Sequence, residues 1–297
     1  MEERKSNINW FPGHMRKALN ETKENLKLVD LVYETVDARI PFSSRNPELS
    51  EIIDAKPRVI ILNKADLADP KVTAEWIEYY KESNTASVAM EASHKKGLKE
   101  LHEVTMKLAA DILAKAEAKG RIGRPVRVMV VGVPNTGKST LINALAGKKA
   151  AVTGDKPGVT RAPKWIKTEG RLELMDMPGV LWPKIQSKRS GVVLTATGAV
   201  KSEVTDTVEI AYHTMQILNE LYPDLMEERY KYDLSDEQYE YMPDPLYELF
   251  LEAAKKKGCI MSGGRIDEER FARLLLDDLQ AGRIGRKGTG KVVHQLS

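Results

Sequence analysis

The stretch Gly132-Val133-Pro134-Asn135-Thr136-Gly137-Lys138-Ser139 decides the fold of this chain. It matches the pattern GxxxxGK[ST], in which a glycine-rich loop joins a buried strand to a helix. The apolar run 126–131 precedes the loop and the helical run 140–145 follows it, as the pattern requires. Backbone N–H groups in such a loop can bind phosphates, while Lys138 adds a cation and Ser139 adds a hydroxyl ligand for Mg²⁺. The sequence therefore predicts a nucleoside triphosphate site here.

Strand patterns alternate with helical patterns along the first two thirds of the chain. Strand-like runs lie at 31–36, 59–62, 126–131 and 172–175, and helical patterns lie at 15–28, 70–81, 97–119 and 140–145. This alternation predicts the α/β class with a mostly parallel sheet. After about residue 203 only helical patterns remain, at 210–221, 246–256 and 267–279. We expect two domains, 1–200 and an all-helical 201–297.

Length and composition set the broad class of the protein. The chain has 297 residues, 42% of them hydrophobic and 30% charged, which is typical of a globular protein with room for two domains. Its one cysteine, Cys259, excludes a disulfide framework and a multi-cysteine zinc site. The charged start, 1–5, and the short apolar runs give no sign of a secretory signal or a membrane helix. We expect a cytoplasmic monomer with no membrane partner.

A second phosphate-side motif follows the strand-like run 172–175. Asp176 and Gly179 form the pattern DxxG, in which the carboxylate can hold the hydration shell of Mg²⁺ and the glycine N–H can contact a γ-phosphate. Between the two motifs, Thr160 in the segment Pro157-Gly158-Val159-Thr160 is a candidate second Mg²⁺ ligand that a triphosphate would order. Taken alone, Thr160 is equally well explained as a threonine in a turn.

The segment Asn63-Lys64-Ala65-Asp66 follows a strand-like run and matches the NKxD pattern of guanine recognition. The Asp66 carboxylate can accept hydrogen bonds from N1–H and the 2-amino group of guanine, whereas adenine offers neither donor. Lys64 can lay its stem over the base, and Asn63 can tie this segment to the glycine-rich loop. The segment Glu91-Ala92-Ser93-His94 resembles the loop that backs guanine, with glutamate at the usual serine position. The alternative explanation of 63–66 is a helix cap.

The order of these motifs is unusual, because the base motif precedes the glycine-rich loop and DxxG comes last. This order resembles that of the circularly permuted GTPases. Within that group, the chain resembles the bacterial ribosome biogenesis GTPase A (YlqF) family over residues 8–200, and beyond 203 only in its helical character. The segments that carry the resemblance are 10–15 (WFPGHM), 37–41 (DARIP), 46–47 (NP), 63–66 (NKAD), 132–140 (GVPNTGKST), 157–160 (PGVT) and 176–179 (DMPG).

The resemblance implies a circularly permuted P-loop GTPase fold that binds GTP and GDP and hydrolyses GTP, with Mg²⁺ as cofactor. It implies nucleotide contacts from Asn63, Lys64, Asp66, Glu91, Ala92, Pro134, Asn135, Thr136, Gly137, Lys138, Ser139, Thr140, Thr160 and Gly179. It assigns Mg²⁺ to Ser139, Thr160 and Asp176, and catalysis to His14, Lys138, Thr160 and Gly179. It also implies a role in assembling the large (50S) ribosomal subunit, with binding to the rRNA of its precursor and an affinity that switches with nucleotide state.

Hydrolysis needs a group that orients the attacking water. Many GTPases carry glutamine directly after DxxG, but this chain has Val180, so we expect slow intrinsic turnover that the ribosome stimulates. The resemblance places His14 near the nucleotide, where a neutral imidazole could orient water, and the alternative is a structural or RNA-contacting histidine. In similar GTPases the position of Asn135 is associated with an activating K⁺ that adds positive charge between the phosphates, and the alternative is a turn asparagine.

Charge is unevenly distributed, although the net charge is only +3. Residues 148–201 hold 11 basic and 4 acidic residues, residues 203–252 hold 2 and 14, and residues 253–297 hold 10 and 5. The clustered basic residues are Lys148, Lys149, Lys164, Lys167, Lys184, Lys188, Arg189, Lys255, Lys256, Lys257, Arg283, Arg286, Lys287 and Lys291. Such clusters favour a polyanion such as RNA, although solvated helix faces explain them too.

A second class of function that fits the motifs is a nucleotide-dependent switch in signalling or at a membrane.

Overall fold

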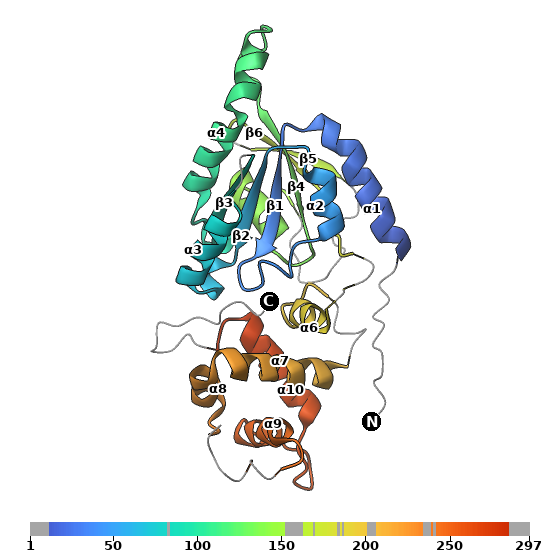
Figure 1. The fold of residues 1–297 in the computed structure, drawn as a ribbon, viewed down its shortest axis with the longest axis vertical. Coiled ribbons are helices and arrows are strands. Elements are labelled where there is room, and N and C mark those ends of the chain that lie inside the picture. The colour runs from blue at the N-terminus through green and yellow to red at the C-terminus, as the bar shows by residue number, and fades with distance from the viewer. Residues whose placement is uncertain are drawn as a thin grey trace. The chain divides into compact units, whose positions relative to one another are not determined.

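The computed structural model describes residues 12–81, 84–151, 163–168, 170–182, 185, 187–200, 206–233, 239 and 242–284, with side chains from residue 16 onward. The chain folds into two compact units, Met1–Gln186 and Ser187–Ser297 (Figure 1). The first unit combines strands and helices, and the described part of the second unit is helical. The α/β class expected from the alternating patterns is confirmed.

The first unit is built on a six-stranded sheet with the strand order β3-β2-β1-β4-β6-β5. All neighbouring strands are parallel except β5 and β6, which are antiparallel, so the expectation of a mostly parallel sheet is correct. The strands are β1 (Leu31–Asp37), β2 (Arg58–Asn63), β3 (Thr85–Met90), β4 (Val126–Gly132), β5 (Lys164–Lys167) and β6 (Leu172–Asp176). Their register brings the carboxyl ends of β1, β2 and β4 to one edge, because Asp37 lies opposite Asn63 and Thr35 opposite Gly132.

Helices cover both faces of this sheet (Figure 1). One face packs against α4 (Leu98–Glu117) and α5 (Lys138–Ala146). The other face packs against α1 (Pro12–Asn25), α2 (Pro47–Ile53) and the end of α3 (Pro70–Tyr79). Because both faces are buried, the central strands consist of nearly continuous apolar runs rather than alternating ones.

The sequence patterns do not predict β3, β5 or α2. β3 is composed largely of small residues, Thr-Ala-Ser-Val-Ala-Met, and β5 is only four residues long with one buried side chain, Ile166. The start of α2 is nevertheless encoded locally. The Asn46 side chain accepts a hydrogen bond from the Leu49 N–H at 3.3 Å, and Pro47 occupies the first helical turn, where a missing N–H costs nothing.

Within its described residues, the second unit is helical apart from an isolated bridge between Ile260 and Ile266. Its helices are α6 (Lys188–Ala196), α7 (Thr207–Leu221), α8 (Pro223–Tyr230), α9 (Pro245–Lys256) and α10 (Glu268–Gln280). α6 packs against α7 and α10, and the Gln280 side chain donates a hydrogen bond to the Ala196 carbonyl at 2.9 Å. The division between units therefore falls before α6, whereas the sequence patterns place it at residue 200.

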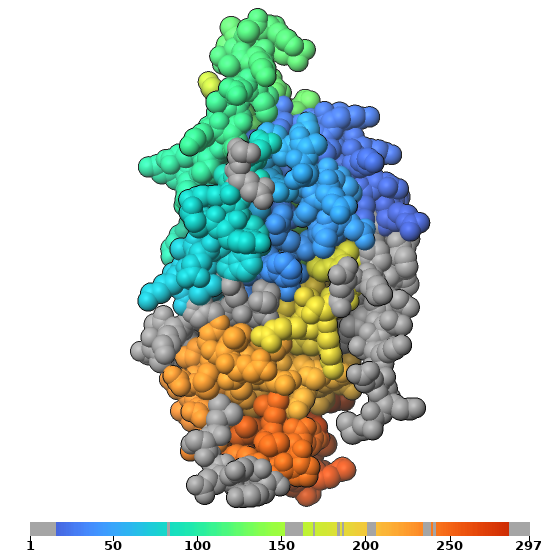
Figure 2. Space-filling model, in the orientation of Figure 1, coloured from blue at the N-terminus to red at the C-terminus, as the bar shows by residue number. Residues whose placement is uncertain are grey.

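The end of α4 and the loop that follows it project from the rest of the first unit (Figures 1 and 2), and Ile122 in that loop is 84% exposed. Among the described residues, no helix has both the length and the apolar character needed to cross a membrane.

Candidate nucleotide site

The glycine-rich loop lies between β4 and α5 and depends on backbone conformations that favour glycine. Gly132 and Gly137 have positive φ values of 151° and 84°. A Cβ atom on Gly132 would lie 2.5 Å from the Thr35 carbonyl oxygen, and one on Gly137 would lie 2.1 Å from Asn63 Nδ2. Both glycines are therefore required by close packing of the loop against the ends of β1 and β2.

Side chains inside the loop fix its shape. Thr136 is 1% exposed, and its hydroxyl donates to the Val133 carbonyl at 3.1 Å and lies 2.8 Å from the Thr35 hydroxyl. Asn135 adopts the left-handed conformation with φ 64°. Since the Thr136 hydroxyl is engaged within the protein, any contact that Thr136 makes to a phosphate would come from its backbone N–H.

Lys138 and Asp176 bring the glycine-rich loop and the DxxG segment together. Lys138 Nζ lies 3.8 Å from Asp176 Oδ1, and both residues are buried. Burial lowers the pKa of Lys138, and the Asp176 carboxylate opposes that shift. Ser139, next to Lys138, and Asp176 offer a hydroxyl and a carboxylate, the hard oxygen donors that Mg²⁺ prefers. These residues fit a magnesium ion bound with a triphosphate.

The DxxG segment also contacts the glycine-rich loop through its backbone. A Cβ atom on Gly179 would lie 3.1 Å from the Pro134 nitrogen, so Gly179 approaches that loop closely. The next residue, Val180, is 3% exposed. Its N–H donates to the Gly132 carbonyl at 3.3 Å, and its carbonyl accepts from the Asn46 side chain at 3.2 Å. Val180 therefore anchors the segment in the core, and its side chain offers no polar group to water.

Asn63, the last residue of β2, joins three loops. Its Nδ2 donates to the Thr136 carbonyl at 2.8 Å, and its Oδ1 accepts from the Ala92 N–H at 3.2 Å. Asn63 is 2% exposed, so both hydrogen bonds are shielded from water. The expectation that Asn63 ties the base segment to the glycine-rich loop is confirmed, and the same side chain also holds the 91–94 segment.

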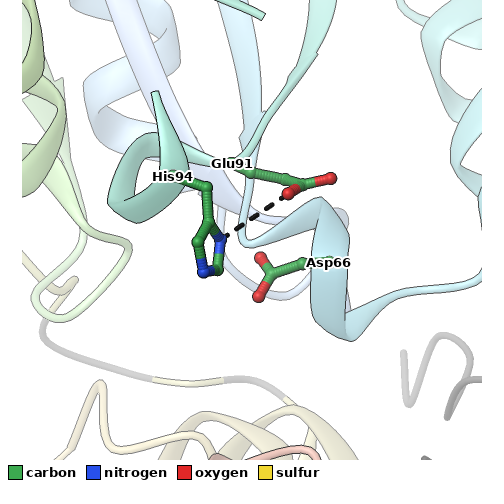
Figure 3. Close-up of side chains that lie close together, drawn as sticks. All are labelled: Asp66, Glu91 and His94. Atoms are coloured by element: carbon green, nitrogen blue, oxygen red, sulfur yellow. Dashed lines mark ion pairs between the residues drawn. The ribbon is translucent and has the colours of Figure 1, made fainter. Parts of the chain in front are cut away.

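The remaining base-side residues cluster beside Asn63. Asp66 lies in the short 3₁₀ turn η2 (Ala65–Leu67), whereas Glu91 and His94 come from the segment after β3. A ligand atom of each lies within 4.8 Å of the others, and His94 Nδ1 is 3.6 Å from Glu91 Oε2 (Figure 3). Two carboxylates and an imidazole can also bind a divalent metal. The sequence predicts roles at this site for Asp66 and Glu91 but none for His94.

A cavity of about 340 Å³ opens beside this cluster, between the 91–94 segment and α5. Its lining includes Ala92, Ser93, Lys95, Thr140, Asn143 and Ala144. A volume of this size is in the range of small-molecule pockets. The cavity therefore runs from the 91–94 segment, on the base side, to the helix α5, which begins directly after the glycine-rich loop.

Two residues expected at the site lie partly or wholly outside the described residues. His14 lies in the first turn of α1, but its side chain is outside the described residues, as is the whole of Thr160. Gly179 and the residues of 132–140 do lie together. The sequence predicts no individual role for Asp37, Arg39 and Asn46, although the segments 37–41 and 46–47 contribute to the family resemblance.

The chain is similar to a known protein family, to known relatives and to solved structures. A family described as 50S ribosome-binding GTPase (MMR_HSR1) matches residues 127–238. The chain is 45% identical over 279 residues to Ribosome biogenesis GTPase A of Priestia megaterium, covering 94% of each protein, and 31% identical to that of Thermotoga maritima, covering 94% and 92%. Among solved structures it is similar to GDP-bound TM YlqF (TM-score 0.61) and GNP-bound YlqF from T. maritima (TM-score 0.60). Each is 27% identical, and coverage is 89% and 95% for the first and 90% and 96% for the second.

Proposed function

Since this chain belongs to the ribosome biogenesis GTPase A family and is a GTPase, we propose that it assembles the large (50S) ribosomal subunit in the cytoplasm. In this proposal it acts as a monomer, binds precursor rRNA and changes its affinity with nucleotide state. The observation that carries the nucleotide part is the position of Asn63, whose side chain bonds a residue 73 positions away in the glycine-rich loop and also holds the 91–94 segment. Base-side and phosphate-side loops thereby form one site despite their permuted order.

We assign nucleotide contacts to the residues expected from the sequence. Asp66 would accept hydrogen bonds from guanine while Lys64, Glu91 and Ala92 flank the base, and the loop 134–140 would bind the phosphates. Mg²⁺ would be held by Ser139, Thr160 and Asp176 and would neutralise charge on the β- and γ-phosphates. Lys138 would contact the same phosphates, and the Gly179 N–H would meet the γ-phosphate.

Hydrolysis in this site lacks the glutamine that usually orients water. The water oxygen attacks the γ-phosphorus, the bond to the β–γ bridging oxygen breaks, and GDP leaves. We assign the orientation of water to His14 and a supporting positive charge to K⁺ at Asn135. The His14→Ala variant should lose ribosome-stimulated turnover by about a hundredfold and keep its affinity for GDP. His102→Ala, an exposed histidine on α4, is the matched control and should leave both unchanged.

Basic side chains support an RNA partner, and the structure sorts them. In the second unit, Lys188 pairs with Glu209 at 3.7 Å and Arg189 pairs with Glu220 at 3.2 Å. Lys256 pairs with Glu252 and Arg283 pairs with Asp278 as well. Paired side chains such as these have less charge to offer a polyanion. We therefore assign phosphate contacts to the basic residues of the clusters outside these four ion pairs, and we expect RNA binding to weaken steeply with salt.

The test is co-sedimentation of the full chain with purified large subunits, with GTPase rates measured with and without them. We expect more sedimentation with a GTP analogue than with GDP, and a turnover at least about tenfold faster with large subunits than with small subunits. Nucleotide binding without sedimentation or stimulation would contradict the ribosomal role and favour a signalling switch. Equal sedimentation in both nucleotide states would contradict the switching of affinity.

A further inference from the structure

A buried pair of charged residues lies directly behind the base segment. Asp37 ends β1 and is opposite Asn63 in the register with β2, and it is 3% exposed. Arg39 is 1% exposed. Arg39 Nε donates to Asp37 Oδ1 at 2.9 Å, a terminal nitrogen donates to Oδ2 at 2.6 Å, and the Arg39 N–H donates to Oδ1 at 3.1 Å. The guanidinium therefore binds the carboxylate through two parallel hydrogen bonds, the strongest geometry for such a pair.

The same carboxylate reaches the base segment. Lys64 Nζ lies 3.0 Å from Asp37 Oδ2, so one oxygen is shared between Arg39 and Lys64. Arg39 in turn interacts electrostatically with Asp66. The four groups form an alternating series, Asp66, Arg39, Asp37 and Lys64, in which two positive charges offset two negative ones.

The protonation states agree with this series. Burial alone would raise the pKa of Asp37, but the charges of Arg39 and Lys64 outweigh it and hold that pKa below its usual range. Burial would lower the pKa of Arg39, and the charges of Asp37 and Asp66 outweigh that effect too. Asp37 and Arg39 are therefore both ionised near neutral pH, and removing either one leaves the other without its two-bond partner in a buried site.

The backbone of Lys64 shows why such support is needed. Lys64 has φ 60°, a left-handed conformation that is unfavourable for a residue other than glycine. The conformation persists only where surrounding contacts enforce it. The ion pair with Asp37 supplies such a contact at the far end of the Lys64 side chain. The preceding residue, Asn63, is held by its own hydrogen bond to the Thr136 carbonyl.

We propose that Asp37 and Arg39 are positioning residues for guanine recognition. They do not touch the nucleotide, but hold Lys64 alongside the base and orient the Asp66 carboxylate towards N1–H and the 2-amino group. This inference rests on the proposed guanine site and assigns a role to the segment 37–41. A merely structural ion pair would contribute to stability without affecting which base is bound.

The test compares two nucleotides that differ only at the 2-amino group. Fluorescent (N-methylanthraniloyl) GDP and IDP are titrated into the full-length protein, because inosine lacks the amino group that Asp66 would accept from. The wild-type protein should bind GDP more tightly than IDP by about tenfold or more, as expected for a hydrogen bond to a charged group. In Arg39→Gln and Asp37→Asn, that ratio should fall towards one while GDP affinity falls by about tenfold or more. The kcat at saturating GTP should change by less than about twofold, because the phosphate side is intact.

A second ion pair on the same strand provides the matched control. Glu34 on β1 is 1% exposed and binds Arg45 through two bonds of 3.0 and 3.1 Å, but this pair joins β1 to Ser50 of α2. Arg45→Gln should lower the melting temperature by a similar amount to Arg39→Gln and leave the GDP-to-IDP ratio at the wild-type value. If Arg39→Gln does not fold, Arg39→Lys keeps the charge, loses the two-bond geometry and is expected to reduce the ratio.

The outcomes separate this inference from the proposed function. Asp66→Asn should abolish the preference for GDP over IDP, and an unchanged ratio in that variant would overturn the guanine site itself. If Asp66→Asn behaves as expected but folded Asp37→Asn and Arg39 variants keep the wild-type ratio, the positioning role is wrong. An equal fall of the ratio in Arg45→Gln would also overturn it, because the effect would then follow from destabilisation alone.

Discussion

The base segment, residues 63–66, is held mainly by side-chain hydrogen bonds and ion pairs, whereas the glycine-rich loop, residues 132–139, is shaped mainly by its backbone conformation. The base segment is fixed by the Asn63 amide and by the ion pair of Lys64 with Asp37. The glycine-rich loop is fixed by positive-φ residues and by approaches too close for a Cβ atom. Both halves meet at the same edge of one parallel sheet.

The difference has consequences for how each half responds to change. A backbone position that fits only glycine cannot accept any other side chain without distortion of the loop, so a substitution there should remove nucleotide binding altogether. A network of side chains can lose one member and keep the rest, so substitutions in the base half should grade affinity and selectivity. The phosphate half would then decide whether a nucleotide binds, and the base half which one.

The largest effect is expected for Gly132→Ala. The new Cβ would lie 2.5 Å from the Thr35 carbonyl oxygen in a positive-φ conformation, so we expect a loss of about 3 kcal/mol or more of unfolding free energy and no measurable GDP binding. Urea denaturation and calorimetry measure the two. Gly123→Ala is the control, because φ there is 74° but nothing lies within 4 Å of the added atom. Wild-type GDP binding by Gly132→Ala would contradict the backbone account.

The second largest effect is expected for Lys138→Ala. It removes the cation at the phosphates and leaves the Asp176 carboxylate without the charge 3.8 Å away. We expect kcat to fall by about a hundredfold to a thousandfold, as for the loss of one strong transition-state contact. The GDP-to-IDP ratio should stay at the wild-type value, since the base half is untouched. A changed ratio with normal kcat would mean that the two halves do not divide the work as described.

Asn63→Ala tests the link between the halves. The substitution removes the bonds to the Thr136 carbonyl and the Ala92 N–H, and it leaves these buried groups unsatisfied. We expect a loss of about 2–3 kcal/mol in unfolding free energy and a GDP affinity lower by about tenfold to a hundredfold. Chemical denaturation and nucleotide titration check both. A variant of normal stability and affinity would show that the loops converge without Asn63.

The smallest effect concerns pH. The folded pKa of Asp37 lies below its unfolded value, so the stabilisation from its ion pairs is fully present above about pH 4 and is lost as pH falls through the folded pKa. Asp37→Asn should therefore be less stable than wild type near pH 7, with a difference that narrows on acidification below about pH 4. Urea denaturation at several pH values measures this. A difference that is constant from neutral to acid pH would contradict the ionised state of Asp37.

The sequence predicts much of this fold and site because its signals are local. The strand, glycine-rich loop and helix around 132–139 form one continuous motif, and the carboxyl ends of parallel strands must share an edge, so the convergence of 63–66 with that loop follows. β5 could not be predicted from the sequence, because its four residues, two of them lysines, become a strand only by pairing with β6. The two-bond ion pair between Asp37 and Arg39 could not be predicted, because it depends on side-chain directions and on the register of β1 with β2.

A repeated pentapeptide shows the same limit. Gly-Arg-Ile-Gly-Arg occurs at 120–124 and again at 282–286. Ile122 is 84% exposed in the loop after α4, whereas Ile284, just after α10, is 1% exposed. The identical local sequence cannot distinguish these positions, because burial is decided by what packs around each segment.

Calorimetric titration of the full chain with guanine and adenine nucleotides tests the central claim that loops 63–66, 132–139 and 176–179 form one guanine nucleotide site. We expect one GDP or one GTP bound per chain in the presence of Mg²⁺, and an affinity for ADP and ATP lower by about a thousandfold or more. Equal affinity for ATP and GTP, or no binding of either, would contradict the account.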